Sequence, residues 1–197
     1  MTKQIRDALT QLNHQNLHKL VLDLRDCALG DEQEGISTAQ LFLSSGTITT
    51  LKGQTVSPVV YRADPEKVVW TQPVTVLIGN GTAGPAEIMA SAIADNHRGE
   101  TVGDRTFGTA SMQKLIQLDD GAALILTVAN FYTPAGKEIP AEGVAPKTEV
   151  RTTYDDLVEE SNPNETPLAG QAPSTDDPVI KAAIQILEGA DAAQKSA

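Results

Sequence analysis

The chain has 197 residues, of which 40% are hydrophobic and 21% are charged, and its formal net charge at pH 7 is −11. That length and hydrophobic content suffice for one globular domain with a substantial core. The negative charge argues against nucleic acid or an anionic membrane surface as the main partner. No run approaches the ~20 apolar residues of a membrane span, and no signal peptide precedes the first helical pattern. Because Met1 leads directly into that pattern, we expect a fragment of a longer protein.

The first half of the chain alternates between helical and strand-like spacing of its apolar residues. Helices are predicted for Lys3–His14 and Gly35–Leu43. Strands are predicted for Leu17–Leu24, Thr47–Leu51, Val56–Arg62, Val68–Trp70 and Val74–Ile78. The polar turn Arg25–Gly30 follows the first strand. This alternation predicts an α/β fold with a mainly parallel central sheet.

The most informative stretch begins with the strand Val74–Ile78. It ends in a Gly/Asn-rich turn, Gly79–Gly84, and a helical pattern starts at Pro85, a residue suited to the first helical turn. A strand, a tight glycine turn and a helix start place backbone N–H groups and one side chain where they can face a substrate. The side chain at the tip of this turn therefore decides whether the protein is an enzyme.

The second half of the chain predicts a β-hairpin. A short strand, Thr101–Gly103, leads to the loop Asp104–Ala110. Two longer strands, Met112–Leu118 and Ala123–Thr133, are joined by an Asp-Gly turn, which is a strong local hairpin signal between alternating apolar runs. A loop rich in Gly and Pro, Pro134–Pro146, follows.

Composition divides the chain into three parts. We expect a core over residues 1–151, an acidic flexible linker over 152–175, and a C-terminal helix over 176–190 that packs back on the core. Asp177 is expected to cap that helix and Pro178 to begin it.

Four motifs resemble, in the same order, the carboxyl-terminal processing (tail-specific) serine peptidases. They are LVLDLRDCALGDEQEGISTAQLFL, VLIGNGTAGPAEIMASAI, TVGDRTFGTASMQKLIQLDDGAALILTVANFYTPAGKEIPAEGVAPKTEV and DDPVIKAAIQIL. The resemblance runs from about Ile5 to Leu187. It implies a crotonase/ClpP-like peptidase fold with an added β-hairpin, and an extracytoplasmic (periplasmic or secreted) location. Members of the family usually carry a peptide-binding PDZ module, for which this chain has no expected counterpart.

The resemblance also implies a serine nucleophile and a lysine general base. A serine hydroxyl must lose its proton to attack an amide, and a lysine accepts that proton only if burial lowers its pKa. In the family the serine lies in a G-S-A-S-A-S-E-like turn, and its position falls on Gly84, with Glu87 three residues on. The lysine lies in an F-G-K-G-x-x-Q-like loop, and its position falls on Thr109, with Gln113 four residues on.

By this match no catalytic side chain is intact. The residue after the nucleophile normally offers an N–H to the oxyanion, and here it is Pro85, which has none. In the first turn Gly30 is kept, but Leu29 replaces the glycine before it. Glu87 and Gln113 are retained supporting positions, although a carboxylate in the first turn of a helix is stabilising without any function. The pattern predicts a pseudoenzyme that binds a polypeptide with an extended C-terminal segment and does not hydrolyse it.

Two other functions stay open. One is an active serine-type endopeptidase with a relocated dyad, which would draw on the hydroxyls of Thr82, Ser91 or Ser111 and the amine of Lys114. We expect Ser91 to pack inside, and Ser111 and Lys114 to point to opposite faces of a strand if the alternation holds. The other is an oligomerisation or structural module, in which the hairpin edges join copies into a homo-oligomer.

No cofactor, metal ion or nucleic acid is expected as a ligand. His14 and His18 are four residues apart, but the predicted helix stops between them and no third ligand is evident. Cys27 is the single cysteine, which excludes an internal disulfide. We interpret it as a small, partly buried side chain rather than a nucleophile.

Overall fold

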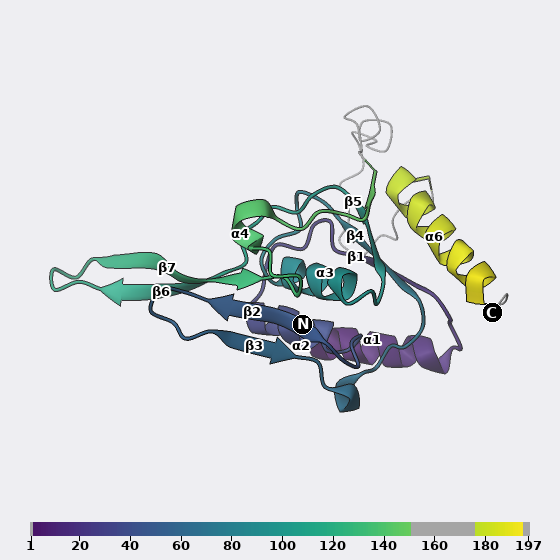
Figure 1. Cartoon of the computed structure of the whole chain (residues 1–197), viewed down its shortest axis with the longest axis horizontal. Coiled ribbons are helices and arrows are strands. Elements are labelled where there is room, and N and C mark those ends of the chain that lie inside the picture. The colour runs from purple at the N-terminus through teal and green to yellow at the C-terminus, as the bar shows by residue number, and fades with distance from the viewer. Residues whose placement is uncertain (1, 151–175, 195–197) are drawn as a thin grey trace, which may run out of the picture.

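The computed structural model describes residues 2–150 and 176–194, in which two four-stranded sheets lie on either side of a buried helix (Figure 1). Sheet A is parallel, in the order β1-β4-β5-β8, and is made of β1 Leu20–Asp23, β4 Val74–Ile78, β5 Glu100–Gly103 and β8 Thr148–Glu149. Sheet B is antiparallel, in the order β3-β2-β7-β6, and is made of β2 Thr47–Lys52, β3 Val59–Arg62, β6 Ser111–Gln117 and β7 Ala123–Tyr132. The helices are α1 Thr2–His14, α2 Glu32–Ala39, α3 Pro85–Asp95, α4 Ile139–Glu142 and α6 Pro178–Gln194, and η1 Pro65–Lys67 is a 3-10 turn. The predicted α/β fold is confirmed.

Strand β4 is the centre of sheet A. All five of its residues are buried, and it is flanked by β1 and β5 in parallel register. A strand covered on both faces reads as a continuous apolar run, which explains the sequence VTVLI. Because β1, β4 and β5 are parallel, their carboxyl ends meet at one edge of the sheet. The turns that follow them, over residues 24–31, 79–84 and 104–110, all leave from that edge.

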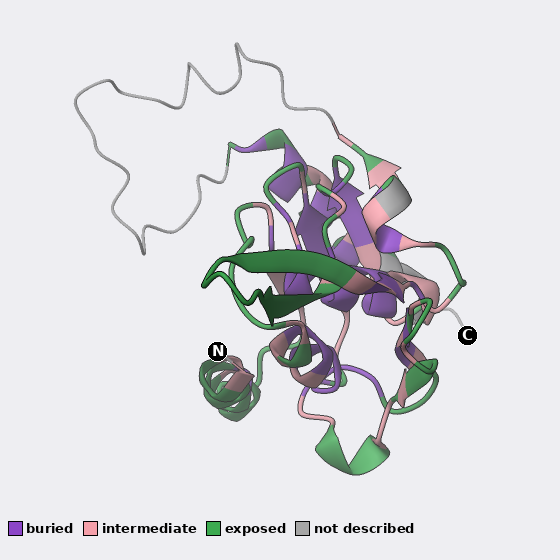
Figure 2. Cartoon of the chain, turned by 90° about the vertical axis from the view of Figure 1, so that its left-hand side faces the viewer, coloured by how far each residue is buried: buried purple, intermediate pink, exposed green. Residues whose placement is uncertain are grey.

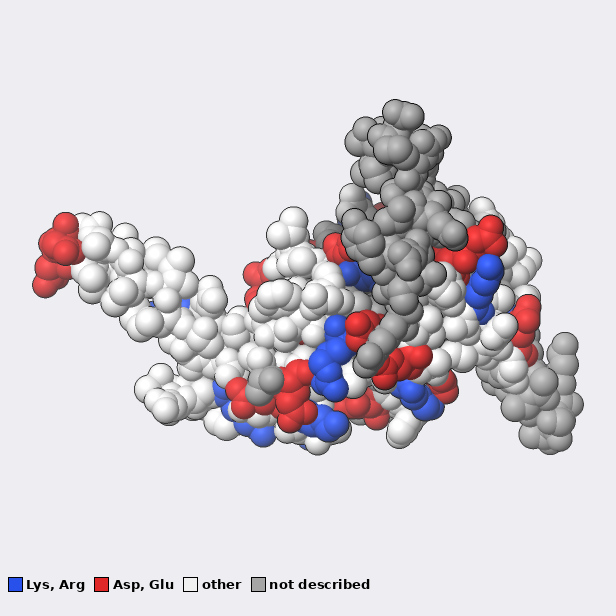
Figure 3. Space-filling view, turned by 90° about the horizontal axis from the view of Figure 1, so that it is seen from above, with Lys and Arg blue, Asp and Glu red and all other residues white. Residues whose placement is uncertain are grey.

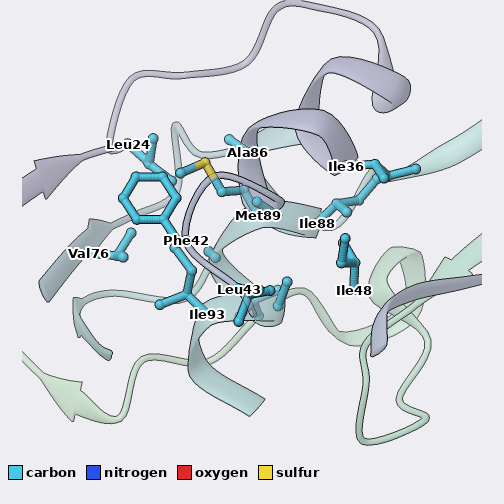
Figure 4. Packing of buried hydrophobic residues seen from close by; sticks show 14 of the residues in the cluster. Leu24, Ile36, Phe42, Leu43, Ile48, Val76, Ala86, Ile88, Met89 and Ile93 are labelled. Atoms are coloured by element: carbon cyan, nitrogen blue, oxygen red, sulfur yellow. The ribbon is translucent and has the colours of Figure 1, made fainter. Parts of the chain in front are cut away.

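Helix α3 fills the space between the two sheets. Every residue from Pro85 to Ile93 is buried, and the helix contacts β5 of sheet A as well as β2 of sheet B. A helix that is apolar nearly all round is one that packs on several sides at once. Figure 4 shows Met89 beside Phe42, and Ile88 toward Ile36 of α2, so α3 also packs against α2 and the segment that follows it.

Helix α6 covers the other face of sheet A. Successive side chains of β4 point to opposite faces, so Val76 belongs to the cluster around α3, whereas Leu77 packs with Val179 and Ala183 of α6. Asp177 caps the helix as predicted, because its side chain accepts a hydrogen bond from the Val179 N–H at 2.8 Å.

The predicted hairpin is confirmed, and it belongs to a larger sheet. Strands β6 and β7 pair in antiparallel register around a turn closed by the Leu118 N–H and the Ala122 carbonyl at 2.8 Å. Only the last three residues of β2, Thr50–Lys52, pair with β7. Beyond that contact the hairpin projects from the body as an arm that is almost entirely exposed (Figures 1 and 2). We refer to residues 112–127 as the arm.

Some predicted boundaries were wrong. Strand β1 covers Leu20–Asp23 rather than Leu17–Leu24. Helix α2 begins at Glu32 rather than Gly35, because the Asp31 side chain accepts a hydrogen bond from the N–H two residues later, at 2.7 Å, and caps the helix early.

The segment Val68–Trp70 was predicted as a strand and is not one. The N–H groups of Val69 and Trp70 both donate to the carbonyl of Leu41, and the Trp70 side chain is fully buried, so the segment is fixed by core packing rather than by a ladder. The predicted loop Pro134–Pro146 contains the helical turn α4. The predicted linker lies outside the described residues, so the three-part division stays a prediction.

Candidate active site

Thr82 joins the three turns at the carboxyl edge of sheet A. Its fully buried hydroxyl donates to the carbonyl of Leu24 at 2.8 Å and accepts from the N–H of Gly79 at 3.0 Å. Its carbonyl accepts from the N–H of Phe107 at 3.0 Å. Thr82, in the turn after β4, is therefore hydrogen-bonded both to the end of β1 and to the loop after β5.

The turn after β1 lies directly on the turn after β4. The N–H of Ala83 donates to the carbonyl of Cys27 at 3.0 Å. A Cβ added to Gly81 would lie 2.4 Å from the carbonyl oxygen of Arg25, so the close approach requires a glycine there. The segment that carries Gly30 is in this way held against the segment that ends at Gly84.

Gly84 is the N-cap of α3 and has φ 55° and ψ −117°. Such a backbone costs an L-residue about 1–3 kcal/mol. A Cβ added there would meet no heavy atom within 4 Å. A sharp, strained strand-to-helix turn of this kind is how α/β hydrolases expose their serine. Pro85 follows at the first helical position and brings no N–H. The turn has the shape to present a side chain and presents none.

Glu87 brings the two candidate catalytic positions together. Its side chain is fully buried, and its Oε2 accepts hydrogen bonds from the N–H of Gly84 at 3.0 Å and of Thr109 at 2.8 Å. Its Oε1 accepts from the Thr106 hydroxyl at 2.5 Å and from the Gly108 N–H at 2.7 Å. The loop that carries the candidate base position and the turn that carries the candidate nucleophile position therefore donate hydrogen bonds to the same carboxylate.

The sequence did not predict how many groups are hydrogen-bonded to Glu87 and Thr106. The Thr106 hydroxyl also accepts from the N–H of Val144 at 2.8 Å, which ties in the segment before β8. The available signal was a carboxylate three residues after the N-cap, which is the spacing of a capping box. That spacing accounts for the bond to Gly84 and gives no sign of the other three donors.

Gln113 stays apart from this cluster. It is exposed on β6, opposite Thr127 of β7, and within residues 2–150 and 176–194 no hydrogen bond joins its side chain to Glu87. It instead lines a hollow beside the N-terminus of α2 together with Asp31 and Tyr61.

Two of the three hydroxyls considered for a relocated dyad, those of Thr82 and Ser91, have other partners. The Thr82 hydroxyl is used as described above, and the buried Ser91 hydroxyl donates to the carbonyl of Ile88 one turn earlier. The register shift between Met112 and Gln113 places its extra residue, Val128, on β7, so β6 is not interrupted there and the expectation that Ser111 and Lys114 point to opposite faces stays a prediction. Within the described ranges no lysine is buried, and Lys114 is exposed.

Cys27 lies near Gly84, the candidate nucleophile position, which sequence reasoning did not anticipate. Its carbonyl is bonded to the residue before Gly84. The Cys27 residue is exposed, so the expectation of a partly buried side chain is wrong. Desolvation by the surrounding protein and the nearby carboxylates of Asp23 and Asp26 raise the pKa of the Cys27 thiol above its ordinary value. The thiolate is the reactive form, so these surroundings make Cys27 a poor replacement for the serine.

The comparison with known families agrees with this geometry. A family model described as peptidase family S41 matches residues 1–150. The chain belongs to peptidase family S41. The resemblance to C-terminal processing peptidases inferred from the four motifs is thereby confirmed.

Several relatives of this S41 domain are C-terminal processing peptidases. The chloroplastic C-terminal processing peptidase of Tetradesmus obliquus is 33% identical over 149 residues, which cover 76% of this chain and 32% of that protein. The carboxyl-terminal-processing protease of Synechocystis is 35% identical over 161 residues, covering 82% of this chain and 38% of that protein. CtpA of Bacillus subtilis is 34% identical over 146 residues, covering 74% and 31%. The chain spans about a third of the length of these curated relatives.

Solved structures share the fold. The photosystem II D1 C-terminal processing protease superposes with a TM-score of 0.71 at 32% identity, covering 76% of this chain and 39% of that one. Mature CPAF superposes with a TM-score of 0.65 at 13% identity, covering 77% and 43%, which is a likeness of fold alone.

Two further observations concern only residues 2–150 and 176–194. No helix there is long and apolar enough to cross a bilayer. No group of three or more His, Cys, Asp or Glu side chains there is placed to hold a metal ion.

Proposed function

We propose that this S41 domain binds extended polypeptide segments at the turn that ends at Gly84 and does not hydrolyse them. The observation that carries the proposal is the pair of positions joined by Glu87. Gly84 and Thr109 donate to the same carboxylate oxygen, yet one has no side chain and the other has no basic group.

The missing groups account for the loss of hydrolysis. Attack on an amide needs a deprotonated nucleophile, and Thr109 offers no base in place of lysine. A donor to the oxyanion is worth about 3–4 kcal/mol of transition-state stabilisation, and Pro85 cannot supply one. The strained turn and the open space at Gly84 are kept, although the groups for hydrolysis are missing. A polypeptide segment could still bind there, which supports a role in binding.

Two exposed apolar side chains support a peptide as the ligand. Leu29, in the turn after β1, is 88% exposed, and Phe107, in the loop after β5, is 63% exposed. The Cys27 carbonyl, two residues before Leu29, accepts from the Ala83 N–H, and the Phe107 N–H donates to the Thr82 carbonyl, so both segments are bonded to the peptide group that joins Thr82 and Ala83, just before Gly84. An extended segment with apolar side chains would cover both of them. We further propose an extracytoplasmic location, since relatives are named as chloroplastic processing peptidases.

Hydrolysis and binding are measured separately. We expect the purified protein to leave an unstructured polypeptide with an apolar C-terminus uncleaved in mass spectrometry, and to bind the corresponding peptide in calorimetry. Leu29→Ser and Phe107→Ser should weaken binding, whereas Val60→Ser, at an exposed apolar residue of β3, should not. Cleavage that is abolished by substituting one residue of this chain would overturn the proposal in favour of a relocated dyad.

A repaired site gives a complementary test. The variant Gly84→Ser, Pro85→Ala, Thr109→Lys restores a nucleophile, a backbone donor and an amine on a frame where a Cβ at residue 84 meets no obstacle. We expect slow cleavage of the bound peptide by this triple variant, and none by Pro85→Ala alone.

A homo-oligomer is the second candidate role, favoured by one observation. The arm exposes a run of large apolar side chains: Met112, Leu115, Ile116, Leu118, Leu124, Ile125 and Leu126. Exposed apolar patches of that kind mark association surfaces. Light scattering that reports a monomer at high micromolar concentration would exclude self-association through the arm.

A further inference from the structure

An ion pair fastens the start of α6 to the turn after β1. Asp177 is only 6% exposed. Its Oδ1 accepts from the N–H groups of Val179 at 2.8 Å and Ile180 at 3.3 Å, and its Oδ2 accepts from Nη1 of Arg25. One carboxylate therefore caps the helix and also pairs with a residue 152 positions earlier in the chain.

Arg25 is held in place from its other side by Asp23. Its Nη2 donates to Asp23 Oδ2 at 2.7 Å, and its Nε lies 3.0 and 3.1 Å from the two Asp23 oxygens. The hydrogen bonds to Asp23, and after them those to Asp177, raise the pKa of the Arg25 guanidinium above its ordinary value. A planar guanidinium between two carboxylates has a defined orientation, which a lysine ammonium would not have.

The same residue continues into the candidate site. Arg25 opens the turn whose backbone lies on Gly81, as its carbonyl oxygen is 2.4 Å from where a Cβ of that glycine would be. Two residues later, the carbonyl of Cys27 holds the N–H of Ala83, the residue before Gly84. A continuous set of contacts thus runs from α6 through Arg25 to the turn that ends at the empty nucleophile position.

We propose that Asp177 and Arg25 are positioning residues through which docked α6 holds the turn Arg25–Gly30 against the turn ending at Gly84. Helix α6 contacts the opposite face of sheet A from α3, so it acts on the site through the ion pair rather than by touching a ligand. The consequence for peptide affinity rests on the proposed function. The coupling between α6 and the turn does not.

Cys27 is a built-in reporter for this coupling. It is the only cysteine of the chain, lies within the turn and is exposed. Its rate of alkylation by iodoacetamide, followed by mass spectrometry from neutral to alkaline pH, yields two separate quantities. The midpoint gives the thiol pKa, and the limiting rate at high pH reports how accessible the thiolate is, which changes when the turn that carries it shifts or becomes more mobile.

Two single substitutions form a matched pair. Asp177→Asn removes the charge that faces Arg25 and keeps the helix cap, because asparagine caps as well as aspartate does. Asp176→Asn removes an equal charge one residue earlier, from a side chain that is 88% exposed and pairs with Lys181. We expect the limiting rate at Cys27 to rise at least about fivefold in Asp177→Asn, within the usual range of coupling between sites, and to stay within about twofold in Asp176→Asn.

Substitutions at Arg25 complete the test. Arg25→Lys keeps the positive charge but loses the planar, forked donor geometry of the guanidinium. It should therefore also raise the limiting rate of Cys27 alkylation. The double variant Arg25→Gln, Asp177→Asn should react no faster than Arg25→Gln alone, because both changes break one interaction. If Asp177→Asn does not fold, the limiting rates of Arg25→Lys and Arg25→Gln, compared with those of the wild type and Asp176→Asn, decide the matter.

The outcomes separate two hypotheses. Equal limiting alkylation rates at Cys27 in the wild type, Asp176→Asn and Asp177→Asn would overturn the proposed coupling. A change in the thiol pKa alone, with the limiting rate unchanged, would overturn it too. If Asp177→Asn binds the peptide more weakly than Asp176→Asn does, the ion pair also affects peptide affinity. If the wild type binds no peptide at all, the proposed function fails, and the alkylation rates still show whether α6 holds the turn.

Discussion

The turn that ends at Gly84 and the arm are held in place by different kinds of interaction. Around the turn, two fully buried polar side chains, those of Glu87 and Thr82, accept or donate six hydrogen bonds to backbone and side-chain groups from three separate segments. The arm has ladder bonds between two strands, and Leu115 and Ile116, which alternate in face, are both exposed. Figure 3 shows the arm as nearly uncharged apart from an acidic tip.

The difference indicates separate roles for the two regions. Buried polar clusters are costly when any member is lost, so they fix geometry closely and are suited to a binding site. An exposed two-stranded ribbon gains little from its own pairing and offers apolar area to a partner. If this is correct, equivalent substitutions should have large effects at the turn and small effects on the arm.

The largest effect is expected for Glu87→Gln. The amide nitrogen that replaces one carboxylate oxygen cannot accept from the N–H groups that face it, so buried donors lose their partner. We expect the free energy of unfolding to fall by about 2–4 kcal/mol in urea titration. Glu66→Gln, at an exposed residue of η1, serves as the control and should stay within about 0.5 kcal/mol of the wild type. A similar value for both variants would show that the cluster is not the support we describe.

Threonine-to-valine changes compare the two regions directly. Thr82→Val keeps the shape of the side chain, but it leaves the Leu24 carbonyl and the Gly79 N–H without their partner. We expect a loss of about 1–3 kcal/mol for this variant, measured by urea titration. Thr127→Val, on the exposed part of the arm, should change stability by no more than about 0.5 kcal/mol. Equal losses would contradict the contrast between the turn and the arm.

Glycine-to-alanine changes isolate backbone strain. Gly84 and Gly121 have φ of +55° and +87°, and a Cβ at either would meet nothing within 4 Å, so neither substitution creates a steric clash. Gly84→Ala should lower the unfolding free energy by about 1–2 kcal/mol, because the strained turn lies inside the cooperative structure. Gly121→Ala should leave the global transition within about 0.5 kcal/mol, since the arm tip opens locally, and increase hydrogen exchange at the arm amides alone. A global loss from Gly121→Ala would show that the arm is part of the core folding unit.

The smallest effect on stability is expected for Ile125→Lys, which replaces a 65% exposed apolar side chain of the arm. The change should alter the free energy of unfolding by no more than about 0.5 kcal/mol. If the arm joins copies of the chain, the same change should lower the average mass in light scattering at high protein concentration. An oligomer that is unaffected by Ile125→Lys would have its interface elsewhere.

Local patterns were enough to predict much of the fold. The hairpin followed from two apolar runs around an Asp-Gly turn, and α3 followed from Pro85 behind a glycine turn, because both signals act between residues that are close in the chain. One segment whose structure depends on a distant partner was predicted wrongly. It is Val68–Trp70, which looks like a strand and is instead pinned by the carbonyl of Leu41.

The sequence by itself determined which chemical groups positions 84 and 109 of this family S41 chain can offer. Glycine has no side chain and threonine has no basic group, and folding cannot add either. Only the tertiary structure decided how those positions relate to each other and to the rest of the site. Glu87 reaches donors 19 to 22 residues away, Gln113 lies apart from them, and Arg25 meets Asp177 across 152 residues. These contacts depend on which turns a parallel sheet gathers at one edge, and no pattern of neighbouring residues encodes that arrangement.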